Sequence, residues 1–237
     1  MTIKLFDLCG TDEDLRFSPF VWRTKLALKH KGLDFETIPW RFQEKDAIAA
    51  SGQTRVPVII DGPEDEPASW VSDSWKIAEY LDEAYPDRPA LFGSPAGMAH
   101  LRFLSFWVDR SLFPVLTPPI ILPLMELLSA DDEAYFRKTR EPRFGSTLEA
   151  FAQRDGGTLH KLNAVLEPLR QTVRKQPFLG GDAPDYGDYM VFGVFQWARC
   201  ASPEDLLQAD DPVYQWRGRV LDLFDGYAAQ APCRVAA

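Results

Sequence analysis

The feature that most constrains this fold is a change of secondary-structure pattern around residues 87–96. Before this segment, short apolar runs typical of strands alternate with amphipathic helical runs, and after it only helical patterns remain. The segment itself, DRPALFGSPA, holds two prolines and a glycine and is typical of a linker. We therefore predict an α/β domain over residues 1–86 and an all-α domain over residues 97–237.

The predicted elements of the first domain follow the order βαβαββα. We expect strands over residues 3–7, 34–39, 56–60 and 69–71, and helices over residues 18–32, 44–50 and 72–85. The turn-rich run DGPEDEP separates the last two strands, and Pro86 ends the last helix. Alternation of this kind predicts an α/β unit.

The second domain is expected to contain six helices. They cover residues 98–113, 120–128, 132–140, 147–175, 186–201 and 213–228. We expect Pro118 and Pro119 to break the chain between the first two, and Pro168 to kink the long fourth helix. In DYGDYMVFG, Asp185 and Asp188 occupy the N-cap and N3 positions of a capping box, which predicts a strong helix start inside the core.

Composition excludes several classes of function. Apolar residues make up 46% of the 237 residues, enough for a substantial core, while the net charge of −9 disfavours binding to nucleic acid or to anionic membranes. The most apolar stretch begins at Pro114, contains four prolines and is too short to span a bilayer. The start MTIKLFDL lacks the pattern of a secretory signal. We expect a soluble protein without membrane partners.

The three cysteines, Cys9, Cys200 and Cys233, are far apart and form no CxxC pair. This spacing predicts neither a disulfide framework nor a zinc site, and we expect no metal. A reducing cytoplasmic location fits this usage best.

The run RFSPFVWRTK contains a clear helix start. Ser18 is a good N-cap, and Pro19 fits the first helical position, where no backbone donor is missed. The helix should end near Gly32, after three basic residues. Taken alone, this pattern is also that of an ordinary surface helix.

Two further motifs follow this helix. In RVPVII, Val56 precedes Pro57 at the head of an apolar strand, where a proline belongs at an edge or at the first residue, with a trans or a cis bond. In WVSDSWKIAEYL, Asp73 and Ser74 lie at a helix entrance, close to free amides and the positive end of the helix dipole. Each motif alone is also compatible with a purely structural role.

Together and in this order, SPF, VP and SDS on a βαβαββα frame resemble the glutathione transferase superfamily over essentially the whole chain. The runs RFSPFVWRTKLALKHKG and RVPVI…VSDSWKIAEYLDEAYP are most similar to the bacterial β-aryl etherases, which cleave lignin ethers, and to their fungal relatives. The resemblance implies a thioredoxin-like glutathione-binding domain, a helical domain that forms the electrophile pocket, and a homodimer.

The resemblance also implies where glutathione, the co-substrate, would bind. The backbone of Val56, beside Pro57, would pair with its cysteinyl residue, and Ser74 and Asp73 would hold the γ-glutamyl carboxylate and amino group. The candidates for the glycyl carboxylate, which are equally plausible as solvated side chains, are Arg55, Gln53 and Arg41.

In this interpretation Ser18 is the catalytic residue because it donates a hydrogen bond to the glutathione sulfur; it is not itself a nucleophile. The insert GTDEDLRF before it departs from the shortest family pattern, which reaches the serine sooner. Cys9 is the rival thiol, although we prefer to interpret it as a buried, unreactive cysteine.

The electrophile is expected to be hydrophobic and aromatic. Aromatic residues on the expected inner helices are candidates to line its pocket, or to form plain core: Phe103, Phe106, Trp107, Phe113, Tyr189, Phe192 and Trp197. Three hypotheses stay open: a transferase acting on an aryl ether, halide or similar electrophile in detoxification or lignin degradation, a non-catalytic glutathione-binding interaction protein, and a glutathione-dependent reductase that uses Cys9.

Overall fold

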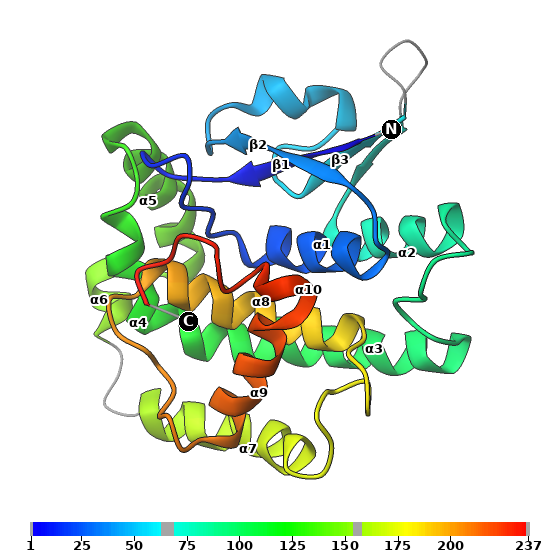
Figure 1. Cartoon of the computed structure of the whole chain (residues 1–237). Helices are drawn as coiled ribbons and strands as arrows, with labels where there is room; N and C mark the ends of the chain where they lie inside the picture. The colour runs from blue at the N-terminus through cyan, green and yellow to red at the C-terminus, as the bar shows by residue number, and fades with distance from the viewer. Residues whose placement is uncertain (1, 63–68, 154–157, 236–237) are drawn as a thin grey trace.

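The computed structural model describes residues 2–62, 69–153 and 158–235 of the chain (Figure 1). Its N-terminal region contains a mixed four-stranded sheet, in the order β2-β1-β3-β4. The strands are β1 (Ile3–Leu8), β2 (Phe35–Trp40), β3 (Val58–Asp61) and β4 (Ser69–Ser72). Strands β1 and β2 are parallel, and the other two pairs are antiparallel. The predicted α/β fold is confirmed; the predicted turn DGPEDEP falls largely on residues 63–68, outside the described residues.

The helices of this region are α1 (Pro19–His30), the 3-10 helix η1 (Lys45–Ser51) and α2 (Ser74–Ala84). Helices α1 and α2 lie between the sheet and the helical region (Figure 1). The predicted start of α1 is confirmed, because the Ser18 side chain accepts a hydrogen bond from the Val21 amide and Pro19 is the first helical residue.

The C-terminal region is helical, as predicted. It comprises α3 (Pro95–Trp107), a π-helical turn η2 (Val108–Leu112), α4 (Phe113–Met125), α5 (Ala130–Phe144), α6 (Leu148–Ala152), α7 (Thr158–Val173), α8 (Tyr186–Ala201), α9 (Pro212–Leu221) and α10 (Leu223–Gly226). Helix α8 begins with the predicted capping box of Asp185 and Asp188. No helix in the described part of the chain is long and apolar enough to cross a membrane.

The prediction that Pro118 and Pro119 interrupt the chain was wrong, since both lie inside α4. Two prolines remove two helical hydrogen bonds, but the apolar side chains of α4 are buried against neighbouring helices, and this packing outweighs the loss. The Thr117 hydroxyl also donates to the Phe113 carbonyl over 2.7 Å.

Two of the long predicted helices are each divided. The span 147–175 forms α6 and α7, and α6 is capped at Gln153. The span 213–228 is interrupted after α9, where Phe224 and Asp225 adopt positive φ values of 55° and 59°. Glycines adjoin both breaks: Gly156 and Gly157 lie in the sequence between α6 and α7, and Gly226, with a φ of 72°, directly follows Asp225. The prediction gave too little weight to these breaker residues inside long helical patterns.

Helix α8 is the central element between the two regions, and α1 packs directly on it (Figure 1). The close approach depends on Gly193, because a Cβ atom there would lie 2.4 Å from the Pro19 carbonyl oxygen. His30 Nδ1 lies 2.7 Å from the Tyr189 hydroxyl, and Arg23 forms a 3.0 Å ion pair with Asp109. These contacts, at the start, middle and end of α1, hold the whole helix against the helical region.

Candidate active site

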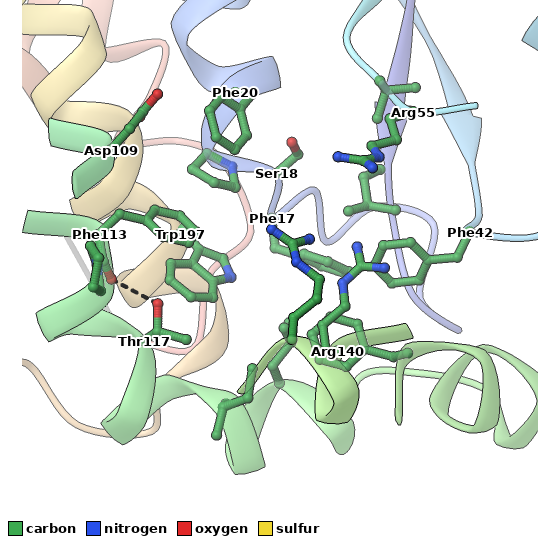
Figure 2. A pocket seen from close by; sticks show the side chains of 18 of the residues that line it. Phe17, Ser18, Phe20, Phe42, Arg55, Asp109, Phe113, Thr117, Arg140 and Trp197 are labelled. Atoms are coloured by element: carbon green, nitrogen blue, oxygen red, sulfur yellow. Dashed lines mark hydrogen bonds between the residues drawn. The ribbon is translucent and has the colours of Figure 1, made fainter. Parts of the chain in front are cut away.

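A cavity of about 660 Å³ lies between the N-terminal region and helices α3 to α6. Ser18 lies on its wall, with Phe20, Asp109, Phe113 and Trp197 on one side (Figure 2). Arg55, Phe42 and Arg140 lie on the opposite side. The cavity therefore places a helix N-terminus between an aromatic wall and a group of arginines.

The hydroxyl of Ser18 is buried, at 3% exposure of the residue, but it faces the cavity. Its oxygen accepts from the Val21 amide at 3.3 Å, and its carbonyl accepts from the Trp22 amide at 3.0 Å. Within the described residues, neither the Ser18 hydroxyl proton nor the Phe20 amide makes a hydrogen bond. Because Pro19 has no amide proton, these two groups are the donors that the first turn of α1 offers to an anion.

The peptide bond between Val56 and Pro57 is cis, and β3 begins one residue later. Val56 lines the cavity, and its backbone amide and carbonyl make no hydrogen bond to any described residue. The Pro57 carbonyl accepts from the Asp73 amide at 3.3 Å, which brings the start of α2 next to this free strand edge. A peptide in extended conformation could pair with Val56 here.

Asp73 and Ser74 lie at the start of α2, beside the cavity lining and not within it. One carboxylate oxygen of Asp73 accepts from the amides of Trp75 and Lys76, at 3.0 and 3.1 Å. Asp73 has a φ of 76°, an unusual conformation for a residue other than glycine. Ser74 is buried, and its carbonyl accepts a 2.6 Å hydrogen bond from the Tyr186 hydroxyl of α8.

The structure places the three candidates for the glycyl carboxylate very differently. The guanidinium of Arg55 points into the cavity (Figure 2), and Arg55 forms no ion pair with any described residue. Arg41 is already paired with Glu13 at 2.7 Å and Glu44 at 3.3 Å. Gln53 is exposed and does not line the cavity. Only Arg55 of the three is brought to the site.

Sequence reasoning missed two arginines of α5, Arg140 and Arg143, which also line the cavity. The Arg140 guanidinium lies 4.9 Å from the centre of the Phe136 ring and 5.6 Å from that of Phe42. Burial lowers the pKa of Arg140, and the like charges of Arg143 and Arg55 lower it further. Neither Arg140 nor Arg143 forms an ion pair with a carboxylate of the described residues. The cavity therefore has positive charge available for an anionic ligand.

Three of the seven aromatic residues expected to line the pocket do so: Phe106, Phe113 and Trp197. Phe113 and Trp197 stack with ring centres 4.9 Å apart and planes 8° apart. The other four are core or surface residues: Tyr189 and Phe192 are buried, Trp107 is partly buried, and Phe103 is 77% exposed. The rest of the aromatic lining comes from residues that were not anticipated: Phe17, Phe20, Trp40, Phe42, Tyr135, Phe136, Phe144 and Phe151.

Cys9 is fully buried and does not line the cavity. Its thiol donates to the Trp40 carbonyl at 3.7 Å, and burial raises the pKa of this thiol. A raised pKa leaves less thiolate at neutral pH. The placement therefore favours Ser18 over Cys9 as the residue that acts on a bound thiol.

A mixed four-stranded sheet, a helical region and a cavity beside the N-cap of the first helix are together the architecture of the glutathione transferases. Two family profiles match the chain accordingly. "Glutathione S-transferase, N-terminal domain" covers residues 17–84, and "Glutathione S-transferase, C-terminal domain" covers residues 100–226. The chain belongs to the glutathione S-transferase family, whose co-substrate is glutathione.

Individual relatives agree with this assignment. The chain is 27% identical to glutathione S-transferase omega-1 of Mus musculus, over 85% of this chain and 72% of the relative. Among solved structures, a glutathione transferase of Phanerochaete chrysosporium superposes with a TM-score of 0.74 at 26% identity, over 97% of this chain and 95% of the other. A glutathione S-transferase of Ceriporiopsis subvermispora, solved in complex with glutathione, gives 0.71 at 26% identity, over 98% and 96%.

Proposed function

We propose that this protein transfers glutathione to a hydrophobic aromatic electrophile, and that the Ser18 hydroxyl and the Phe20 amide stabilise the glutathione thiolate. One observation carries the proposal: two unused donors of the first turn of α1 face a cavity that is largely aromatic. A thiolate placed there would accept from both donors, while the electrophile occupies the space next to Phe113 and Trp197.

The other parts of glutathione can be placed along the edge of the cavity in a single orientation. The free backbone groups of Val56 would pair with the cysteinyl residue, and the start of α2, at Asp73 and Ser74, would receive the γ-glutamyl end. Arg55 and Arg140 would bind the glycyl carboxylate, because both line the side of the cavity away from Phe113 and Trp197 and neither forms an ion pair with a described residue. The relative solved in complex with glutathione supports this part of the proposal.

We further propose that the electrophile is an aryl ether whose β-carbon lies next to a ketone. The thiolate attacks that carbon, a carbon–sulfur bond forms, and the carbon–oxygen bond breaks with release of a phenolate, which takes a proton from water. The aromatic lining supports a substrate with two aromatic rings. General detoxification would use the same thiolate on an aromatic halide.

The proposal also includes three expectations about domain roles, cellular location and subunit pairing. Residues 1–86 would form the glutathione-binding domain, and residues 97–237 the domain of the electrophile. Cysteines present as thiols are compatible with a cytoplasmic protein. Pairing of two subunits is expected from the resemblance alone and is measured by light scattering coupled to gel filtration.

A substrate panel tests the proposal. Racemic aryl ether ketones and a generic aromatic halide are incubated with glutathione, and phenol release and conjugate formation are followed by chromatography. Phenol release that requires glutathione supports ether cleavage, whereas conjugation of the halide alone supports detoxification. No product from either class, with glutathione still bound in calorimetry, would instead identify a non-catalytic glutathione-binding protein.

A further inference from the structure

Cys200 and Cys233 are 33 residues apart in sequence, but their sulfur atoms lie only 2.8 Å apart. Cys200 is in the last turn of α8, and Cys233 belongs to the C-terminal segment, which we define as residues 229–235. Both are free thiols here. Neither takes part in the proposed transfer reaction.

Several hydrogen bonds hold the C-terminal segment against α8. The Val235 amide donates to the Arg199 carbonyl at 3.0 Å, and the Arg199 guanidinium donates back to the Val235 carbonyl at 3.2 Å. Arg234 reaches α4, where it pairs with Glu126 at 2.9 Å. The two sulfur atoms are therefore brought together by the fold and not by a chance contact of a free tail.

The two thiols have unequal surroundings. Cys200 is completely buried, and burial raises the pKa of its thiol. Cys233 is partly exposed and accepts hydrogen bonds at its sulfur from Cys200 and from Gln196 Nε2, at 3.5 Å from the latter. The hydrogen bond from Cys200 lowers the pKa of Cys233. Cys233 is thus the thiol that forms a thiolate and that a reagent can reach.

We propose that Cys200 and Cys233 are a redox-sensitive pair that glutathione disulfide converts to an intramolecular disulfide. In the first step the Cys233 thiolate attacks one sulfur of glutathione disulfide, which forms a mixed disulfide and releases one glutathione thiolate. In the second step Cys200, having lost its proton to solvent, attacks the Cys233 sulfur and releases the second glutathione. The protein loses two hydrogens, and one glutathione disulfide becomes two molecules of glutathione.

The disulfide would close a loop of the chain around α9 and α10 and fix the C-terminal segment to α8. Cys200 also lies 3.5 Å from the Arg16 carbonyl, two residues before Ser18. The bond would therefore restrict the movement of the last turn of α8, which contacts the residues just before the N-terminus of α1. Closure of a loop of this length restricts the unfolded chain, so the oxidised protein should melt about 5–10 °C higher than the reduced protein.

Mass spectrometry of the full chain provides the first test. The reduced protein is equilibrated with glutathione disulfide and excess disulfide is removed. Free thiols are alkylated, and the protein is digested with trypsin without reduction. The expected product joins the peptide of residues 200–217 to that of residues 220–234, and one alkylated cysteine, Cys9, remains. Three alkylated cysteines, a stable glutathione adduct on Cys233, or a bridge to Cys9 would overturn the proposal.

Matched variants provide the second test. In Cys233→Ser, a change in the partly exposed C-terminal segment, oxidation should no longer raise the melting temperature, and Cys9→Ala should keep the full increase. Equal shifts in wild type and Cys233→Ser would overturn the proposal. Because Ser18 takes no part in disulfide formation, Ser18→Ala should still form the bond, and failure of the proposed transferase function would leave this result unaffected.

Discussion

Replacing Ser18 by alanine is the most direct perturbation of the proposed mechanism. The substitution removes the hydroxyl donor that faces the cavity but leaves the Phe20 amide and the aromatic wall in place. We expect glutathione to bind, while the pKa of its bound thiol rises towards the solution value of about 8.5. The loss of rate should therefore be large near neutral pH and small in alkali.

The magnitude follows from the strength of one hydrogen bond to an anion. Such a bond contributes about 1.5–3 kcal/mol, which corresponds to roughly one to two pKa units. If the wild-type complex titrates near 6.5, the thiolate fraction at pH 6.5 should fall from about one half to about 1–10%. A more basic thiolate is also a better nucleophile, with a Brønsted slope of about 0.4–0.5, so we expect a net decrease in kcat of about 2- to 10-fold at that pH.

The assay is a pH profile of kcat with saturating glutathione and an aromatic halide, together with the ultraviolet absorbance of the thiolate in the binary complex. Ser94→Ala is a matched control, because Ser94 also caps a helix before a proline and accepts from the Gly97 amide at 3.0 Å. Both variants should lose about 0.5–2 kcal/mol of stability from the missing cap. Only Ser18→Ala should change the profile.

The reasoning would be refuted by a Ser18→Ala variant that binds glutathione with the same thiol pKa as the wild type. An equal loss of rate in Ser18→Ala and Ser94→Ala would also refute it, because the effect would then come from a weakened helix start and not from the sulfur.

Three further predictions concern other parts of the structure. Gly193→Ala should destabilise the protein by about 1–3 kcal/mol in urea unfolding because its methyl group meets the first turn of α1, whereas Gly218→Ala, with open space at the new methyl, should cost nothing. Burial, together with the charge of its neighbour Asp188, raises the pKa of Asp185 to about 6, above its usual 3.8. The folded state therefore binds the proton more tightly, and stability should fall by up to about 3 kcal/mol as pH rises from 4 to 6; Asp185→Asn keeps the cap and should lack this fall when melting is followed against pH. Arg140→Gln should raise the KM for glutathione about 10-fold or more and leave the KM for an uncharged electrophile unchanged, while Arg137→Gln, an outward arginine paired with Glu133, should change neither in steady-state kinetics.

Local chemistry made the start of α1, the capping box of α8 and the order of strands predictable. In each case the signal lies within a few residues: a serine before a proline, two aspartates three residues apart, or short apolar runs between turns. The prolines of α4 show the limit of such signals. Pro118 and Pro119 disfavour a helix locally, but burial of Leu116, Ile120 and Ile121 in the assembled region decides the outcome.

The site was predictable only where a single segment carries it. Ser18 and Val56, which line the cavity, and Asp73, which lies beside it, were chosen as candidates because each is part of a short motif. Arg55, which also lines the cavity, adjoins one of these motifs. Arg140 and Phe144 reach the cavity only because α5 folds back towards the sheet, and no local pattern in their own helix indicates that. Tertiary packing also separates Phe103 from Phe106, which are one helical turn apart in α3. Only Phe106 lines the cavity, whereas Phe103 is exposed to solvent.

Helix α8 connects the stability of the fold with the proposed chemistry. Its buried side chains form much of the core, Gly193 allows α1 to approach, and Trp197 is part of the cavity wall. Its last turn carries Cys200, which contacts the chain just before Ser18. A displacement of α8 would therefore move the donors of α1 and the aromatic wall together. Because a thiolate hydrogen bond weakens steeply with distance and angle, we expect substitutions that loosen α8 to raise the pKa of the bound thiol before they unfold the protein.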